Sequence, residues 1–189
     1  MTDLPAYKEP VTGIRVYEDA IPRCDELIAW VEEQPYWEPS MVTSPTGENV
    51  QIADYRDSDM LVVPPLSFDV PELWSQTSKI VWNAMRDYAK EWVFDFQYIA
   101  PVSVNRYAPG QKFAEHADAM PGSNRMVSAL IYLNTLEDGS GSTEFTRMGL
   151  TLLPVQGRLV VFPPNYIYRH IAHPPTETKY SMAFWGMAA

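Results

Sequence analysis

The sequence is poor in the residues that form covalent or metal cross-links. Cys24 is its only cysteine, so the chain forms neither an intrachain disulfide nor a zinc cluster of several thiolates. We expect Cys24 to act as a small apolar residue of the core. Basic residues are scarce as well, with 14 Lys and Arg against 24 Asp and Glu and a net charge of −10. This charge repels a phosphate backbone and argues against nucleic-acid binding.

Long hydrophobic runs are also absent. No stretch approaches the roughly 18 consecutive apolar residues of a membrane helix, and Met1 to Pro10 lacks the basic and then apolar pattern of an export signal. We therefore expect a cytoplasmic protein without a membrane partner. With 189 residues, 46% of them hydrophobic, and no repeat or linker, the chain suits a single domain. We expect helical support in residues 1–92 and a catalytic β-core in residues 93–189.

The sequence patterns predict two helices followed by a β-rich half. Apolar residues recur at helical spacing in Pro22 to Glu33 and in Val70 to Lys90. Between them, Pro35 to Pro65 has the composition of a long ordered loop or of short irregular strands. From Phe94 onward, short β-branched and aromatic runs alternate with turn residues and have no helical pattern between them. This order excludes a parallel βαβ fold and favours a mainly β, antiparallel sandwich or barrel with flanking helices.

All three histidines, His116, His170 and His173, lie in the β-rich half. His116 and Asp118 are two residues apart, and such residues project from the same face of an extended strand. A second histidine from a distant strand would complete a triad of two histidines and one carboxylate, which leaves three positions open on Fe(II). The His-x-Asp pair alone is common by chance, so a surface histidine beside a solvated aspartate remains an alternative.

The residues around this pair follow a recognisable order. The stretch Tyr107-Ala-Pro-Gly110 leads to His116-Ala-Asp118, and further motifs follow at Arg125 to Asn134, Gly141 to Phe145, Pro154 to Gly157, His170 to Pro175 and Lys179 to Trp185. In order and spacing this half of the chain resembles the prolyl 4-hydroxylase branch of the 2-oxoglutarate and Fe(II)-dependent oxygenases. The resemblance extends more loosely to Val16 to Val31 and to Tyr55-Arg56-Asp57-Ser58.

The resemblance implies a double-stranded β-helix, a cupin-like jelly roll with the iron between two antiparallel sheets. It implies His116 and Asp118 as two iron ligands, with a distal histidine as the third. In this family a basic residue that binds 2-oxoglutarate follows the distal histidine by nine or ten positions. His170 precedes Lys179 by nine positions and His173 by only six, so we assign His170 to iron. His173 is then expected beside the site or at the surface.

The same resemblance assigns a 2-oxoglutarate site. Lys179 would pair with the distal carboxylate, as a buried carboxylate needs a cationic partner. Tyr107 matches the family's tyrosine that hydrogen-bonds 2-oxoglutarate, and a phenol is a suitable neutral donor. Tyr132 and Thr143 could add hydroxyls to the pocket or could serve only in core packing. A solvent-facing edge lysine and an ordinary strand tyrosine are the alternatives for Lys179 and Tyr107.

The resemblance also indicates residues on the substrate side of the iron. Arg125 and Trp185 match family positions that line the substrate side of the iron, and Arg56 and Ser58 fall where the family carries a substrate-covering loop. We expect the segment from Pro35 to Pro65 to close over the substrate. Arg125 as a solvated turn residue and Trp185 as a core residue are the alternatives. Phe113, where a tyrosine is often found, and the Lys179 spacing of nine depart from the family pattern and bear on substrate orientation.

The sequence thus predicts a dioxygenase that hydroxylates a C–H bond with Fe(II), 2-oxoglutarate, O2 and ascorbate as reductant. The resemblance favours a prolyl residue in a peptide or protein as substrate, and a free amino acid or other small metabolite is the alternative. Asp118 favours hydroxylation over halogenation, because halogenating relatives carry a small residue there. A non-catalytic jelly-roll binding module and a zinc hydrolase are the other classes, but neither accounts for Lys179. The sequence does not indicate an oligomeric state.

Overall fold

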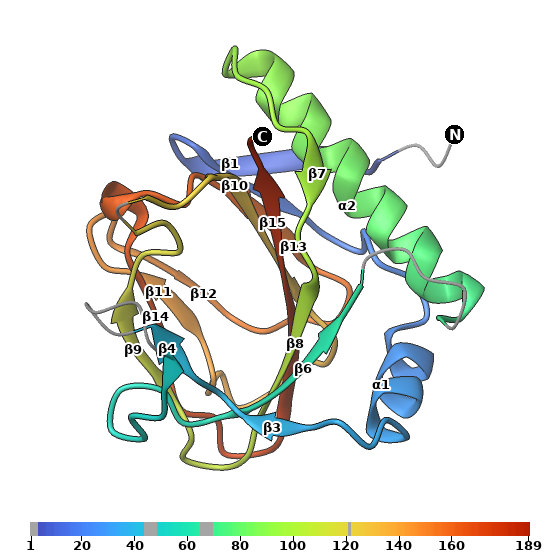
Figure 1. The fold of residues 1–189 in the computed structure, drawn as a ribbon, viewed down its shortest axis with the longest axis vertical. Helices are drawn as coiled ribbons and strands as arrows, with labels where there is room; N and C mark the ends of the chain where they lie inside the picture. Colours follow the sequence, from blue (N-terminus) through green and yellow to red (C-terminus); the bar gives the residue numbers. More distant parts are fainter. Residues whose placement is uncertain (1–3, 44–48, 65–69, 121) are drawn as a thin grey trace.

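A computed structural model describes residues 4–43, 49–64, 70–120 and 122–189. Two antiparallel β-sheets face each other, and Figure 1 shows both α-helices on one side of the larger sheet, away from the smaller one. The mainly β fold class with flanking helices that the sequence predicts is therefore confirmed. Within the described residues, no helix is both long and apolar enough to cross a membrane.

The larger sheet has nine strands, and its strand pairs are antiparallel. In spatial order it contains β1 (Tyr7–Val11), β2 (Ile14–Tyr17), β13 (Leu159–Phe162), β10 (Arg125–Tyr132), β15 (Lys179–Met187), β8 (Val102–Tyr107), β6 (Asp59–Val63) and β3 (Glu38–Pro39), while β7 (Tyr98–Ile99) also pairs with β15. The long strand β15 thus lies in the middle of the sheet, where both of its edges are paired.

The smaller sheet has four strands, in the order β12 (Leu150–Leu152), β11 (Thr143–Phe145), β14 (His170–Ala172) and β9 (Phe113–His116). A short 3-10 helix, Tyr166–Tyr168, precedes β14, and β4 (Val42–Thr43) pairs with β5 (Asn49–Val50) in a separate two-stranded unit. The two facing antiparallel sheets are the arrangement expected of a double-stranded β-helix.

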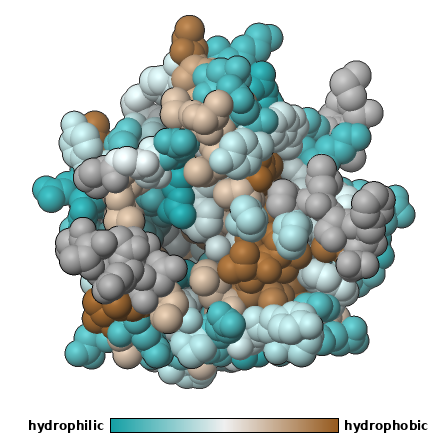
Figure 2. Space-filling view, in the orientation of Figure 1, coloured by the Kyte–Doolittle hydropathy of each residue, from teal (hydrophilic) through white to brown (hydrophobic). Residues whose placement is uncertain are grey.

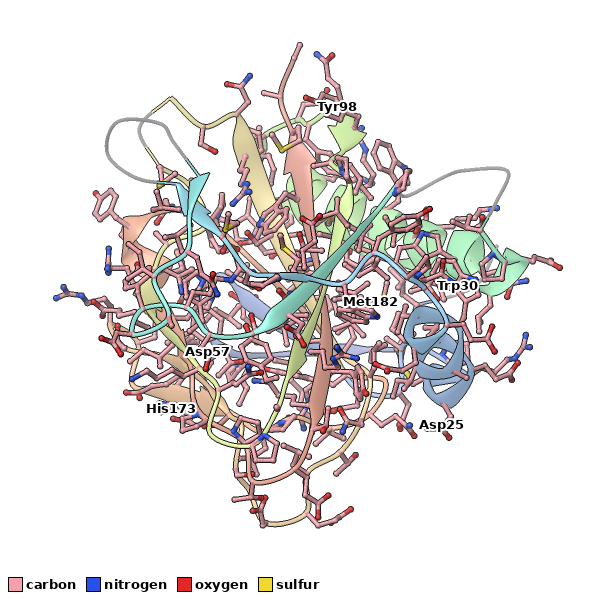
Figure 3. All side chains as sticks on the ribbon, turned by 60° about the horizontal axis from the view of Figure 1, so that its bottom comes forward. Asp25, Trp30, Asp57, Tyr98, His173 and Met182 are labelled. Carbon is pink, nitrogen blue, oxygen red and sulfur yellow. The ribbon has the colours of Figure 1, made fainter. Side chains whose placement is uncertain are left out.

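Side chains of the large sheet alternate between its two faces. On β15, Met182 and Phe184 belong to the core between this sheet and the helices, and Figure 3 shows Met182 near Trp30 of the helical layer. The alternate residues Lys179, Ser181 and Trp185 face the space between the sheets. This period of two follows from the pleat of a strand, and it places polar residues of a buried strand in the interior of the jelly roll.

Both predicted helices are present. Helix α1 runs over Cys24–Glu32 and α2 over Glu72–Glu91, within two residues of the predicted boundaries. Cys24 is buried, as expected, and lies on the apolar face of α1 with Leu27 and Val31. The face of α2 that contacts the sheet contains Trp74, Val81 and other residues of the same core. The helices therefore cover one face of the large sheet and leave the other face for the interior of the jelly roll.

The prediction of residues 1–92 as helical support must be corrected, because four of their strands belong to the large sheet. Strands β1 and β2 extend the sheet beyond β13, and β6 and β3 extend it beyond β8. The four residues of β2 are all buried, since Ile14 and Val16 face the smaller sheet while Arg15 and Tyr17 face the helical side. The alternation of polar and apolar residues that marks a half-exposed strand is therefore missing from β2.

The segment from Pro35 to Pro65 forms short strands in its described part, the second of the two predicted possibilities. Residues 44–48 and 65 lie outside the described residues. Figure 2 shows a largely hydrophilic face with hydrophobic side chains gathered near β6, where Val62 is half exposed. Arg56 forms a bridge with Phe113 of β9, so this segment connects the edges of the two sheets.

Candidate active site

Two histidines and one aspartate meet where the smaller sheet faces the larger one. His116 ends β9 and His170 begins β14, and the register of these paired strands places the two residues directly opposite each other. His116 Nε2 lies 3.7 Å and His170 Nε2 lies 3.9 Å from Asp118 Oδ1. The nearest ligand atoms of the three side chains all fall within 4.8 Å of one another, so a single ion could contact all three.

Asp118 reaches this position from a loop, and this corrects the expectation that His116 and Asp118 share one face of an extended strand. Strand β9 ends at His116, and Asp118 lies two residues beyond it. The opposite sheet holds the aspartate: Ser128 Oγ on β10 donates to Asp118 Oδ2 over 2.5 Å. Arg125, at the start of the same strand, donates from Nη1 to the Asp118 backbone carbonyl over 2.6 Å. The triad therefore depends on both sheets.

The two imidazole rings are oriented by backbone carbonyls. Nδ1 of His116 lies 2.8 Å from the carbonyl oxygen of Ala114, and Nδ1 of His170 lies 3.1 Å from that of Tyr168. A carbonyl only accepts, so each Nδ1 must carry the proton and donate it. Each Nε2 is then free to coordinate a metal ion. Phe113 stacks on the His116 ring at a centroid distance of 3.5 Å and restricts its rotation.

The electrostatics of the site favour the metal-binding protonation states. Burial, together with the neighbouring His170, lowers the pKa of His116 to about 3 and keeps its ring neutral. Burial alone would raise the pKa of Asp118, but the two imidazoles and the Ser128 hydroxyl outweigh it and lower that pKa. Neutral imidazole and ionised carboxylate are the forms that coordinate metals. Two histidines and one carboxylate with open positions suit non-haem Fe(II).

Ser128 provides a test of this arrangement. We expect Ser128→Ala to weaken Fe(II) binding by about 10- to 100-fold, because the carboxylate loses the hydroxyl that orients it. Isothermal titration with Fe(II) under anaerobic conditions measures the effect. Ser103→Ala is the control, since Ser103 is a buried serine of the same sheet that makes no side-chain hydrogen bond to the triad in the described structure. Equal affinities of Ser128→Ala and the unmodified protein would contradict the role of this hydroxyl.

His173 lies apart from the triad. Its Nε2 is 2.7 Å from Glu144 Oε2, and both side chains are more than a third exposed. Figure 3 shows His173 at the periphery of the molecule, and it directly follows β14 of the smaller sheet. The ion pair with Glu144, on the neighbouring strand β11, accounts for this histidine without a metal ion.

A cavity of about 1010 Å³ opens over the triad between the two sheets. All but one of the further candidate residues line it, namely Arg56, Tyr107, Arg125, Tyr132, Thr143, Lys179 and Trp185. The exception is Ser58, which does not line the cavity and is 3% exposed. Its hydroxyl lies 2.7 Å from that of Ser40, so it connects β3 and β6 instead of facing a substrate.

One end of the cavity is built around a buried lysine. Lys179 is 1% exposed, and its Nζ donates to the Gly141 carbonyl over 2.8 Å and lies 4.6 Å from the centre of the Tyr107 ring. Burial lowers the pKa of Lys179 to about 7. Gly141 has a φ of +65°, and a Cβ there would lie 3.2 Å from Lys179 Cδ. The positive φ favours glycine at this position, and a side chain here would crowd Lys179.

Hydroxyl groups accompany this lysine. Tyr107 lies opposite Lys179 in the register of β8 and β15. Burial raises the pKa of Tyr107, and burial raises the pKa of Tyr132 to about 12, so both phenols keep their protons at neutral pH. The Tyr132 hydroxyl is buried and has no hydrogen-bond partner among the described residues. Together with Thr143 this end offers one cation and several donors, which is the chemistry that binds a carboxylate.

The cavity wall also carries two arginines. Arg125 lies over the Trp185 ring at 3.8 Å, and Arg56 lies over the Phe113 ring at 4.6 Å and donates to Asn105 Oδ1 over 2.8 Å. Sequence reasoning missed Ser128, Asn105 and Ser181. Asn105 and Ser181 lie two residues from Tyr107 and Lys179 on the same strands and also line the cavity, so the period of two could have identified them.

Comparisons with known proteins agree with this geometry. Residues 102–187 match the family model of the 2OG-Fe(II) oxygenase superfamily. This range contains the triad and Lys179 but not Arg56. No curated protein matches the chain in a sequence search.

Solved structures of prolyl hydroxylases have a similar fold. A Pseudomonas putida prolyl-4-hydroxylase has a TM-score of 0.74 at 19% identity, covering 96% of this chain and 95% of its own. The viral collagen prolyl hydroxylase of Paramecium Bursaria Chlorella virus-1, solved as a 2OG complex, has a TM-score of 0.71 at 19% identity, covering 94% and 97%. A Trichoplax adhaerens prolyl hydroxylase, in complex with a peptide fragment of the hypoxia inducible factor oxygen degradation domain, has a TM-score of 0.80 at 14% identity, covering 95% and 85%.

Proposed function

We propose that this member of the 2OG-Fe(II) oxygenase superfamily, a 2-oxoglutarate-dependent dioxygenase, hydroxylates a prolyl residue of a peptide or protein. The proposed reaction converts a C–H bond, 2-oxoglutarate and O2 into a C–OH group, succinate and CO2. The observation that carries the proposal is the presence of two features in one cavity: the triad of His116, Asp118 and His170, and the buried Lys179 without a carboxylate partner among the described residues.

The triad residues would hold Fe(II). Their donor set fits this ion, because the Nδ1 atoms of both histidines are engaged by carbonyls and Asp118 is ionised. Bound Fe(II) supplies the oxidising chemistry together with 2-oxoglutarate and O2. The protein's part is to hold the ligands in place: Ser128 and Arg125 hold Asp118 from the large sheet, and Phe113 stacks on His116. A preorganised donor set of this kind limits reorganisation on binding.

Lys179 and Tyr107 would bind the distal carboxylate of 2-oxoglutarate. The Lys179 ammonium provides the charge, and the protonated Tyr107 phenol donates a hydrogen bond. Tyr132 and Thr143 line the same part of the cavity and would add hydroxyl donors. A zinc hydrolase or a binding module has no use for a buried, unpaired lysine in the same cavity as a metal triad. The cosubstrate therefore accounts for a group that is otherwise costly to bury.

The prolyl substrate rests on the relatives. The solved structures compared above are described as prolyl hydroxylases, and one of them contains a peptide. The described part of the segment from Pro35 to Pro65 borders the cavity through residues such as Met41 and Met60. This segment would exclude water from the bound substrate. We further propose ascorbate as the reductant, a cytoplasmic location, and a single domain over residues 1–189.

The experiment measures both products of one reaction. The protein is incubated with Fe(II), 2-oxoglutarate, ascorbate and O2, together with proline-containing peptides or free proline. We expect one peptide to gain the mass of one oxygen atom while succinate forms in equal amount, and we expect neither product when 2-oxoglutarate is omitted. Oxygen incorporation without 2-oxoglutarate would contradict the proposed reaction. Hydroxylation of free proline, but of no peptide, would contradict the proposed peptide substrate.

A further inference from the structure

We propose that Arg125 and Arg56 form a binding subsite for a carboxylate of the substrate, so that the hydroxylated molecule carries a negative charge near the reacting carbon. The inference rests on the proposed function and specifies its substrate class. Both arginines line the cavity, and each is partly buried.

The first observation is that these two arginines lack carboxylate partners. The protein has nine arginines, and six of them form ion pairs with Asp or Glu: Arg15, Arg23, Arg86, Arg106, Arg158 and Arg169. Among the described residues, Arg56, Arg125 and the exposed Arg147 form none. In a chain with 24 acidic residues, the two unpaired arginines that are partly buried both face the cavity.

A β-bulge turns Arg125 toward the cavity. In β10, Ser128 pairs with Trp185, Val127 pairs with Gly186, and Arg125 pairs with Met187, so Met126 is an extra residue without a partner. Val127 faces the helical core, and without the bulge Arg125 would face the same side. With the bulge, its guanidinium lies over Trp185 and bonds only to a backbone carbonyl, that of Asp118. Four of the five guanidinium N–H groups are left for other contacts.

Arg56 presents a similar set of donors to the cavity. Its guanidinium contacts neutral acceptors, namely the Met41 carbonyl at 3.1 Å and Asn105 Oδ1 at 2.8 Å, and its Nε is buried without a partner. An anion in the cavity would supply the acceptor and the charge that the free N–H groups of both arginines lack.

The charges of the site leave these arginines uncompensated. In the proposed complex, the positive charges of Fe(II) and Lys179 equal the negative charges of Asp118 and a 2-oxoglutarate dianion. The cavity's other described carboxylate is Glu38, which is exposed and forms no ion pair with a described residue. The buried Nε1 of Trp185 also lacks a partner among the described atoms. Around these arginines the cavity thus has many donors and few acceptors, and a substrate carboxylate supplies both acceptors and charge.

A substrate carboxylate can come from two sources, the α-carboxylate of a free amino acid or an acidic side chain beside a proline in a peptide. The experiment therefore compares two matched pairs of probes: L-proline with L-prolinamide, and acetyl-Glu-Pro-Glu-amide with acetyl-Gln-Pro-Gln-amide. Binding to the protein loaded with Fe(II) and 2-oxoglutarate is measured by anaerobic calorimetry, so that no turnover occurs. The pair in which the carboxylate probe binds more tightly than its amide identifies the source of the substrate carboxylate.

We expect the carboxylate member of at least one pair to bind about 10- to 100-fold more tightly than its amide, as for a charge-assisted hydrogen bond. Arg125→Gln and Arg56→Gln should each reduce this ratio toward one. Arg147→Gln removes the same charge from an exposed arginine outside the cavity and should keep the ratio. Since both members of a pair are measured on one variant, a general loss of stability or metal affinity does not change the ratio.

Two results would overturn the inference: no carboxylate probe binds more tightly than its amide, or the preference is the same in the Arg125→Gln and Arg56→Gln variants. The first would mean that the guanidiniums recognise neutral groups, such as the carbonyl oxygens of a peptide. Either failure is distinct from failure of the proposed function, because hydroxylation of the glutamine peptide would still support a prolyl hydroxylase. Tight binding of a carboxylate probe without hydroxylation would support the subsite and count against the prolyl substrate.

Discussion

Replacing His116, Asp118 or His170 with alanine is expected to reduce succinate release to the level seen without enzyme. Each substitution removes one of three side chains whose ligand atoms lie within 4.8 Å of one another, so the ion loses a third of its protein contacts. In Asp118→Ala the loss is also electrostatic, because the site loses its only carboxylate and a divalent cation is then held by two neutral rings. Succinate release with saturating 2-oxoglutarate and Fe(II) measures the effect.

His173→Ala is the matched control, because it removes the third histidine of the chain and only an exposed ion pair with Glu144 is lost. We expect it to keep most of the activity, since exposed ion pairs contribute about 0–1 kcal/mol to stability. Anaerobic titration with Fe(II) separates metal binding from folding, and circular dichroism confirms the fold of each variant. An inactive His173→Ala beside an active His170→Ala would reverse the assignment of the distal ligand.

Lys179→Met is expected to have two opposite effects. The affinity for 2-oxoglutarate should fall by about 10²- to 10⁴-fold, which corresponds to the roughly 3–5 kcal/mol lost when one partner of a buried ion pair is removed. The free energy of unfolding without 2-oxoglutarate should rise by about 1–4 kcal/mol, because methionine fills the same volume without the cost of burying an amine. Calorimetric titration with 2-oxoglutarate and chemical denaturation without it measure the two effects.

The pH dependence of stability gives this prediction a second readout. Burial lowers the pKa of Lys179 to about 7 in the folded protein, below its ordinary value of 10.5. Between these two pH values the unfolded chain binds more protons than the folded one, so the contribution of Lys179 to stability rises with pH across this window. Lys179→Met should lack this rise, and Lys79→Met, which changes an exposed lysine of α2, should keep it. Equal pH profiles in the two variants would show that Lys179 does not titrate near neutrality.

The sequence predicted the helices, the β-rich half and most of the cavity lining for specific reasons. Cys24, Leu27 and Val31 recur at helical spacing on α1, so the helix was visible without tertiary information. His116, Asp118, His170 and Lys179 were found because their spacing resembles that of a known family. Whether these residues bind iron and 2-oxoglutarate stays a prediction, although the structure gathers them in one cavity.

Features that depend on contacts between distant strands could not be predicted. The four buried residues of β2 do not alternate in polarity, because both faces of this strand are covered. Ser128 looks like any strand serine until the register places it beside Asp118, ten residues away in the sequence. Ser58 was placed on the substrate side by its sequence neighbours, but its hydroxyl faces Ser40 instead. In each case the missing information is which strand lies next to which.

The bulge in β10 decides which of two neighbouring side chains faces the cavity. Loss of the extra residue Met126 would restore the regular register and leave Arg125 directly before Val127, so the arginine would still face the cavity opposite Met187. Regular pairing without a deletion would instead place Met126 opposite Met187 and turn Arg125 toward the apolar layer beneath the helices, where Val127 and Ala129 lie and where a charge is costly to bury. A change of register alone would therefore exchange a charged side chain for an apolar one on the cavity wall, without any substitution among the residues that hold the metal.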